Sequence, residues 1–186
     1  MEKVAIFIDG GYLSKVLTES FSCAKIDFAK LSNLLADGKQ ILRTYYYHCM
    51  PYKDAAPTAE QIKRFNNMQR FITSLEYLDR YKVRLGKLEY RGQNSDGTPI
   101  YQQKRVDILL GCDLVLLAAK QRIGTAIIIT GDSDFIPAID VAKNEGVEIE
   151  LVFDPNHQPH KALTQIADVR RAITQDDIDA VRKFSC

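Results

Sequence analysis

The chain has 186 residues, 46% of them hydrophobic, with a formal net charge of +1. This length allows one buried core and is too short for two ordinary domains, so we expect a single domain over residues 1–186, with 159–186 as a C-terminal extension packed on it. No stretch approaches the ~20 apolar residues of a membrane span, and the four scattered cysteines favour reduced thiols, so we expect a cytoplasmic protein without membrane contact.

Strand-like and helix-like segments alternate along the chain, which is typical of a parallel sheet joined by right-handed crossovers. Short apolar or β-branched runs predict five strands, at 4–8, 41–49, 83–90, 125–129 and 147–153. Helical spacing predicts helices over 27–36, from Thr58 to about Tyr81, over 104–120, after Asp134, and as one or two short helices in the tail. The helix over 104–120 is apolar almost all round and is expected to lie deep, while 91–99 is expected to be a loop.

Charge is unevenly distributed along the chain. Residues 1–60 are balanced, 61–105 hold 10 basic and 4 acidic residues, and 106–186 hold 8 basic and 13 acidic residues. A phosphate-binding flank beside a carboxylate metal site would give this pattern, because the two tasks need opposite charge. A helix face with ordinary solvated lysine and arginine side chains would give it equally well.

Aspartates follow the two strands whose ends should meet. Asp9 ends the first run, and Asp132 and Asp134 follow the run TAIII. The nearly apolar helix before that run adds Asp107 and Asp113. Ligands of doubly wound sheets bind beyond the carboxyl ends of the strands, and oxygen-only ligand sets suit Mg²⁺ and Mn²⁺. The sequence therefore predicts a Mg²⁺ or Mn²⁺ site at this edge.

Each aspartate also has a structural interpretation. Asp134 would serve as the N-cap of the next helix, with or without a catalytic role, and Asp9 as a plain turn residue before two glycines. Asp107 would cap its own helix or pair with a neighbouring cation. Asp113 lies about 120° around the helix from Asp107, so the two need not share a face, and a structural ion pair is the alternative for Asp113.

Three segments resemble a known family when read in order: VAIFIDGGYL, KRVDILLGCDLV and TAIIITGDSDFIPAIDVAKNEGVEIELV. They are similar to the LabA-like branch of the NYN domains, which belong to the PIN-like nuclease superfamily. The resemblance runs from about Val4 to Asp168, and its most specific part is G-D-S-D-F with a following proline. It implies an α/β, three-layer PIN-like fold with a five-stranded parallel sheet, and metal-dependent hydrolysis of RNA without a covalent intermediate.

The resemblance also implies roles for individual residues. By position, Asp9 matches the first-strand metal ligand, and the other four aspartates match the acidic pairs of the second and third motifs. Thr130 and Ser133 stand where hydroxyl groups support the site. Many relatives carry an asparagine shortly after the first aspartate, whereas this chain has Gly11 and Tyr12. Residues expected to contact substrate are Lys104, Arg105, Thr130, Ser133, Gly10 and Gly11, although Lys104 and Arg105 are equally consistent with plain surface charges.

Two other functions stay open. A phosphatase of the haloacid dehalogenase type would need a second aspartate where Gly11 stands. An RNA-binding module without turnover is the second alternative, since the asparagine is missing. The expected partner is RNA in single-stranded form, and an amphipathic tail docked on a second copy would give a homodimer. Tyr45–Tyr47 are expected to pack in the core more than to stack bases, and His157 and His160 lack the spacing of a metal site.

Overall fold

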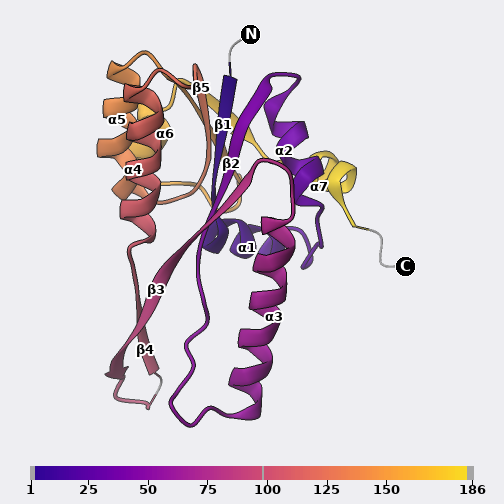
Figure 1. The fold of residues 1–186 in the computed structure, drawn as a ribbon, viewed down its shortest axis with the longest axis vertical. Helices are drawn as coiled ribbons and strands as arrows, with labels where there is room; N and C mark the ends of the chain where they lie inside the picture. The colour runs from indigo at the N-terminus through magenta and orange to yellow at the C-terminus, as the bar shows by residue number, and fades with distance from the viewer. Residues whose placement is uncertain (1–2, 98, 184–186) are drawn as a thin grey trace.

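The computed structural model describes residues 3–97 and 99–183, and a seven-stranded sheet forms its centre (Figure 1). The strand order is β4-β3-β2-β1-β5-β6-β7, and all neighbours are parallel except β3 and β4. The strands are β1 (Lys3–Asp9), β2 (Gln40–Cys49), β3 (Tyr81–Gln93), β4 (Pro99–Lys104), β5 (Thr125–Ile129), β6 (Glu148–Phe153) and β7 (Val169–Ala172). The expected α/β class is therefore right, and the expected count of five strands is wrong.

The two unexpected strands lie at the edges of the sheet. The stretch 91–99, expected to be a loop, completes β3, turns at residues 94–97 and enters β4, so that β3 and β4 form an antiparallel hairpin. In the tail, β7 pairs with β6 in addition to the expected short helices. Both are short edge strands, and such strands carry little apolar periodicity because neither is buried on both faces.

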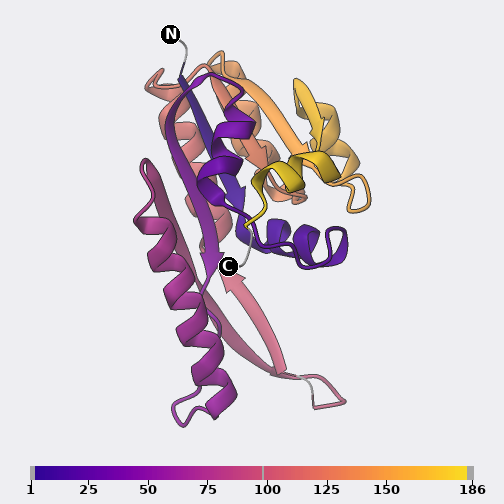
Figure 2. The ribbon, with the colours of Figure 1, turned by 90° about the vertical axis from the view of Figure 1, so that its right-hand side faces the viewer.

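Helices cover both faces of the sheet and make three layers (Figures 1 and 2). The helices are α1 (Gly10–Glu19), α2 (Phe28–Ala36), α3 (Ala59–Glu76), α4 (Val106–Ala119), the short 3₁₀ helix η1 (Ser133–Phe135), α5 (Ile136–Asn144), α6 (Lys161–Ile166) and α7 (Gln175–Val181). One core lies between the sheet and α1, α2, α3 and α7, and the other lies between the sheet and α4, α5 and α6. None of these helices is long and apolar enough to cross a membrane, within the ranges described.

Strand β1 lies in the middle of the sheet. The chain adds β2, β3 and β4 on one side of it and then returns to add β5, β6 and β7 on the other side. The crossover from β1 to β2 uses α1 and α2 on one face, and the crossover from β5 to β6 uses α5 on the opposite face. β1 pairs with both β2 and β5, and Ile8 lies opposite Ile129 in the ladder. The residues that follow Ile8 and Ile129 therefore emerge side by side at a topological switch point, where ligands of such sheets bind.

Helix α4 is tied to the sheet by a buried ion pair. Arg84 of β3 donates from Nε to Oδ2 of Asp113 at 2.8 Å and from Nη2 to the other carboxylate oxygen, and Tyr47 of β2 donates to Oδ2 at 3.0 Å. The helix is not enclosed on all sides, because Ile108 is 69% exposed on its outer face. The expectation that this helix lies deep is therefore wrong.

Replacing Arg84 by methionine should destabilise the fold by about 3 kcal/mol, because the buried Asp113 carboxylate would lose its bidentate cation. Urea denaturation of the wild type and of Arg84→Met measures this free energy of unfolding. The double variant Arg84→Met/Asp113→Leu should recover most of the loss, since the uncompensated charge is gone. A double variant as unstable as the single one would show that the pair does not anchor α4.

Candidate functional site

Asp9 sits at the switch point and is held by three donors. Its side chain caps α1, with Oδ1 accepting hydrogen bonds from the backbone N–H groups of Gly11 at 3.0 Å and Tyr12 at 3.1 Å. Its Oδ2 accepts from the Thr130 hydroxyl at 3.1 Å. The helix begins directly after the strand, and its first residue is a glycine because the Tyr46 ring would be 2.5 Å from a Cβ at position 10. Asp9 is thus a fixed carboxylate at a helix N-terminus and not the plain turn residue that was the structural alternative for it.

Thr130 connects Asp9 to the acidic turn after β5. Its buried hydroxyl donates to Asp9 and accepts from the N–H of Asp132 at 3.2 Å. The side chain of Asp132 then caps η1 by accepting from the N–H of Asp134 at 2.9 Å. The expectation that Asp134 is the helix cap is wrong, since Asp132 has that role and both side chains are exposed.

Asp107 approaches the same place from α4. It lies in the first turn of that helix with its side chain exposed. Partial burial raises its pKa, and the negative charges of Asp132, Asp134 and Asp9 raise it further. The pKa of Asp9 is also raised, mainly by burial and slightly by Asp132, against the opposing effect of its three hydrogen bonds. These four aspartates, which we call the acidic edge, therefore lie near enough to repel one another.

Asp113 does not belong to the acidic edge. Its carboxylate is buried and both oxygens accept hydrogen bonds from Arg84, with a third from Tyr47. The expectation that Asp113 completes the acidic site is not met by this placement, and the structural ion pair considered as its alternative describes it. The physical reason is helix geometry, because Asp107 at the helix start and Asp113 farther along point in different directions.

The donor set of the acidic edge fits a hydrated divalent cation. Among the described residues, no three His, Cys, Asp or Glu side chains stand close enough to hold an ion directly. Mg²⁺ does not require such a cage, because it retains several waters and commonly binds one or two carboxylates. Among the side chains that the structure describes, which do not include that of Lys104, no lysine or arginine forms an ion pair with these four carboxylates. A cation would therefore relieve repulsion that these described side chains do not compensate.

Comparison with known proteins places this arrangement in a family. The NYN domain profile matches residues 3–174. The chain belongs to the NYN domain family. It is 32% identical over 80 residues to an uncharacterized protein, y4oD, of Sinorhizobium fredii, a match that covers 43% of this chain and 33% of that relative. A Vibrio parahaemolyticus protein of unknown function has the same fold, with a TM-score of 0.60 at 18% identity over 98% of this chain and 96% of the other.

Membership in the NYN family indicates a member of the PIN-like nuclease superfamily, whose nucleases typically use divalent metals. The y4oD match reaches only a third of that relative's length, so it says nothing of the rest of that protein. The likeness to the Vibrio structure shows the fold alone. Assignment to the LabA-like branch stays a prediction from the motifs.

An open pocket of about 440 Å³ lies beside two carboxylates of the acidic edge. Its lining consists of Asp9, Tyr12, Lys15, Gly131, Asp132, His157 and Gln158. Gly131 permits the close approach of Tyr12, whose ring would be 2.8 Å from a Cβ there. Lys15 is exposed and is the cation of this lining, so the pocket of this NYN domain combines two acidic groups with one group able to meet a phosphate.

His157 links the loop after β6 to helix α1 at one wall of this pocket, a role that the sequence does not predict. Its Nδ1 lies 2.8 Å from Oδ2 of Asp154, and its Nε2 pairs with Glu19 at the end of α1. The Tyr12 hydroxyl donates to the backbone oxygen of His157 at 2.9 Å and accepts from the N–H of Asp154 at 3.1 Å. The loop after β6 is thereby tied to α1. The hydrogen bonds to Asp154 and Glu19 raise the pKa of His157.

The remaining expected contact residues are distributed unevenly. Arg105 is exposed with φ of 76° directly before α4, while the side chain of Lys104 lies outside the described residues. Gly10 is buried, so its side of the backbone is not open to substrate, and the N–H of Gly11 is occupied by Asp9. Ser133 is half-buried in η1. Tyr45, Tyr46 and Tyr47 are buried, as the packing interpretation predicts.

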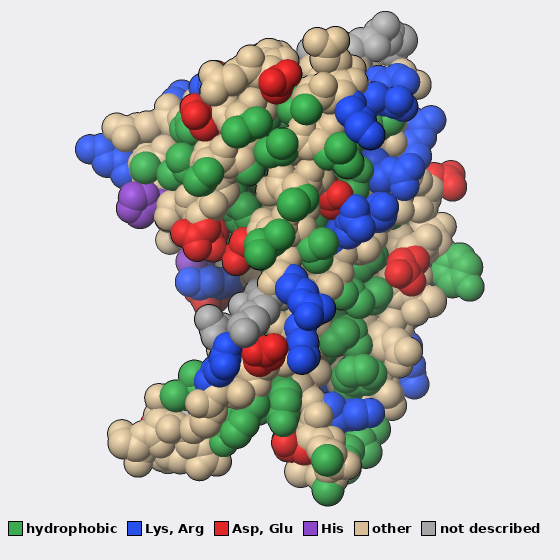
Figure 3. Space-filling view, turned by 60° about the vertical axis from the view of Figure 1, so that its left-hand side comes forward, with side chains coloured by type: hydrophobic (Ala, Val, Ile, Leu, Met, Phe, Trp, Pro, Cys, Tyr) green, Lys and Arg blue, Asp and Glu red, His purple; other side chains and the backbone are tan. Residues whose placement is uncertain are grey.

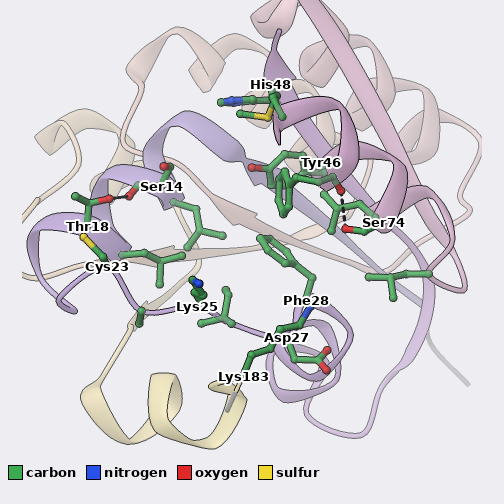
Figure 4. A pocket seen from close by; sticks show the side chains of 18 residues that line it. Ser14, Thr18, Cys23, Lys25, Asp27, Phe28, Tyr46, His48, Ser74 and Lys183 are labelled. Carbon is green, nitrogen blue, oxygen red and sulfur yellow. Dashed lines mark hydrogen bonds between the residues drawn. The ribbon is translucent and has the colours of Figure 1, made fainter. Parts of the chain in front are cut away.

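A second pocket, of about 510 Å³, opens between α1, α2 and α3 (Figure 4). Its walls are largely apolar and include the rings of Tyr46 and Phe28. No residue of the acidic edge lines it. His48 lies at one end of this lining, and its Nδ1 is buried without a hydrogen-bond partner in the described residues. Burial lowers the pKa of His48. This apolar pocket does not suit the charged chemistry of the acidic edge.

Asp107→Asn should raise the melting temperature at pH 7 by about 1–2 °C. Partial burial and the charges of the other three aspartates raise the pKa of Asp107 in the folded state, so its ionised form disfavours folding, and asparagine removes that cost. The gain should vanish below pH 3, where the wild-type carboxyl is protonated in both states. Differential scanning calorimetry measures it, with exposed Asp140→Asn on α5 as the control for the loss of a surface charge. An equal shift in both variants would argue against repulsion at the acidic edge.

His157 should make stability depend on pH on the alkaline side. Because its folded pKa is raised above the unfolded value near 6.5, its contribution is fully present below pH 6.5 and is lost as pH rises through the folded pKa. Urea denaturation of the wild type between pH 6 and pH 9 should show this decline. His157→Gln should be less stable at pH 6 and show a flatter profile. Parallel profiles for the two proteins would rule out a charged His157 clamp.

Proposed function

We propose that this NYN domain is a ribonuclease of the LabA-like branch that depends on Mg²⁺ or Mn²⁺ and hydrolyses RNA phosphodiester bonds at the acidic edge. The observation that carries the proposal is the approach of Asp107 of α4 to Asp9, Asp132 and Asp134 at the switch point of the sheet, where burial and these negative charges raise the pKa of Asp107. Keeping such repulsion costs stability, and perturbed carboxylates in an open pocket are the mark of a functional site. Family membership supports nuclease chemistry over other uses of a carboxylate cluster.

Asp9 and Asp132 are the residues that would hold the cation. Both have one oxygen bound by backbone N–H groups, which fixes the direction of the carboxylate before any ion arrives. Asp107 and Asp134 are exposed on the other side and would reach the ion directly or through its waters. A bound divalent ion supplies a lowered pKa for the attacking water and positive charge opposite the scissile phosphate.

The protein's own groups handle the proton and the substrate charge. Asp107 is the candidate acceptor of the proton from the attacking water, because a carboxylate with a raised pKa takes up a proton more readily than an ordinary aspartate does. The water oxygen bonds to phosphorus as the bond from phosphorus to the leaving oxygen breaks, so no group of the protein is modified. Lys15 in the pocket lining meets a non-bridging phosphate oxygen and holds the chain in place.

An RNA-binding module without turnover is the second candidate. It is favoured by the absence of three direct metal donors among the described residues and by Gly11 and Tyr12 in place of the asparagine of many relatives. The phosphatase alternative has less support, because position 11 offers only a backbone N–H, and that group donates to Asp9.

Asp9→Asn and Asp132→Asn should each lower Mn²⁺-dependent cleavage of a fluorescein-labelled single-stranded RNA by more than about 100-fold, since residues that merely support metal ligands already cost 10–100-fold. Asparagine keeps the capping hydrogen bonds, so both variants should fold. Asp140→Asn on α5 is the matched control, because Asp140 is exposed and lies outside the acidic edge, and this variant should stay within a few-fold of wild type at 25 °C. Gel electrophoresis of the products measures all four proteins.

Thermal unfolding with and without Mn²⁺ tests the metal independently of activity. The ion should raise the melting temperature of the wild type and of Asp140→Asn but not that of Asp9→Asn, because a ligand that binds only the folded state stabilises it. If the wild type binds RNA without cutting it and Mn²⁺ shifts no protein, the module without turnover is the correct function. If Asp140→Asn is as inactive as Asp9→Asn, the loss of activity follows from removing a surface charge and the site is assigned to the wrong aspartates.

A further inference from the structure

Three tyrosines, two of them exposed and one half-buried, pack together outside both hydrophobic cores. Tyr52 follows β2, Tyr90 lies in β3 and Tyr101 lies in β4. Their ring centroids are 5.1 Å apart for Tyr52 and Tyr101, and 6.0 Å apart for each of the other two pairs. Tyr90 is 45% exposed and Tyr101 41% exposed, so part of this aromatic surface stays open to solvent. We call these three residues the tyrosine platform.

The tyrosine platform stands beyond the carboxyl edge of the sheet. Pairing of β2 with β3 ends at Cys49 and Gly86, and β3 runs on to Gln93 with only β4 beside it. The hairpin and the first turns of α3 therefore extend past the end of β1, where Asp9 lies (Figures 1 and 2). Tyr101 precedes Asp107 by six residues. At ~3.3 Å per extended residue, the platform is within about 20 Å of the acidic edge.

The platform also faces the correct side of the sheet. Side chains alternate along β3, and Arg84 contacts Asp113 of α4 while Leu88 packs on the core beneath α4. Tyr90 is two residues beyond Leu88, before the irregularity that begins after Tyr90, so it shares their face. That face is the one whose helix carries Asp107 at its start. A strand passing over Tyr90 and Tyr101 would run toward the acidic edge.

Basic residues lie in the hairpin that carries the platform. Lys87 and Arg91 of β3 are exposed and both pair with Glu89, and Arg105 directly after β4 is also exposed. Lys53 adjoins Tyr52 in sequence, and its Nζ lies 4.8 Å from the ring centroid of Phe65 in α3. On this side of the molecule Lys and Arg side chains lie between the acidic side chains and the two parts that project at the bottom, the β3–β4 hairpin and the start of α3 (Figure 3). An anionic polymer with flat apolar groups is the partner that matches both features.

We propose that the tyrosine platform binds single-stranded RNA by stacking on its bases and directs the backbone toward the acidic edge. The inference rests on the proposed function for the place where the strand is cut, but the stacking itself does not require cleavage. Aromatic rings accept any base, so this contact gives affinity without sequence preference. Duplex RNA hides its base faces, which makes single-stranded RNA the form that the platform selects.

Fluorescence anisotropy with a short fluorescein-labelled oligouridylate tests the platform in EDTA, where cleavage is suppressed. Tyr90→Ala and Tyr101→Ala should each weaken binding at least about 5-fold, the lower bound for losing one base stack. Tyr90→Phe should bind as the wild type does, because the ring is kept. Tyr77→Ala is the matched control, since Tyr77 is 86% exposed at the far end of α3 and belongs to no aromatic contact of the platform.

One further probe separates base stacking from other causes of weaker binding. A labelled abasic oligonucleotide should bind the wild type and Tyr90→Ala equally, because it offers phosphates and no bases. Equal weakening on the abasic and the uridylate probes would overturn the proposal, since Tyr90→Ala would then have disturbed the hairpin or its charges. Wild-type affinity for oligouridylate in both alanine variants, or no affinity in the wild type, would also overturn it and leave the tyrosines to a protein partner.

Hydrolysis of bis(p-nitrophenyl) phosphate with Mn²⁺ keeps this proposal distinct from the nuclease proposal. This small diester reaches the acidic edge without stacking, so the platform variants should hydrolyse it at the wild-type rate, whereas Asp9→Asn should not. If no protein hydrolyses it and the tyrosine variants still lose affinity for oligouridylate, the platform stands and the nuclease proposal falls. If the ester is cut but oligouridylate affinity does not depend on the tyrosines, the reverse holds.

Discussion

The pairing of β1 with β5 is the constraint on which the site depends. Ile8 and Ile129 lie opposite each other in this ladder, so the next residues on both strands leave the sheet at neighbouring points. The Thr130 hydroxyl joins them by hydrogen bonds to Asp9 and to the N–H of Asp132. Because the crossovers from β1 and β5 run on opposite faces, the ends of these two strands form a switch point, where carboxylates can gather.

Helix α4 shows how one element serves stability and chemistry with the same residue type. Asp113 is buried and bound by Arg84 and Tyr47, whereas Asp107, two turns nearer the helix start, is exposed and has no cation partner among the described residues. The buried pair fixes the helix against the sheet and so fixes Asp107. Partial burial and the neighbouring carboxylates raise the pKa of Asp107, and the anchored helix can sustain this cost because its position does not depend on that side chain.

The sequence predicts the parts of this fold that are governed by local periodicity. The buried runs 4–8 and 125–129 became β1 and β5, and Asp27 and Thr58 cap α2 and α3 as expected. The sequence does not indicate helix α1, because its first two residues are glycines, which are typical of a turn. In the structure Tyr46 leaves no room for a side chain at Gly10. The partner of Asp113 could not be predicted either, since Arg84 lies on a strand that contacts α4 only after folding.

Aromatic residues illustrate the same boundary between local and tertiary information. The run Tyr45–Tyr47 is conspicuous in the sequence, yet the sheet buries all three. Tyr52, Tyr90 and Tyr101 are scattered over 50 residues and meet only because the β3–β4 hairpin folds back and the loop after β2 reaches it. Periodicity cannot reveal such a cluster, because the pairing register that joins Tyr90 to Tyr101 is not written in either strand alone.

The β3–β4 hairpin also places basic residues on a different element from the carboxylates of the acidic edge. A metal site needs carboxylates, while a polyanionic substrate is repelled by them. In this chain the basic excess lies in 61–105 and the acidic edge begins at Asp107, so the sign of the charge changes where β4 passes into α4. Arg105 takes φ of 76° at this junction, a sharp change of backbone direction between the strand and the helix. The proposed binding over the hairpin and the proposed cleavage at the acidic edge therefore lie on adjacent parts of the chain with opposite charge, joined by one short stretch of backbone.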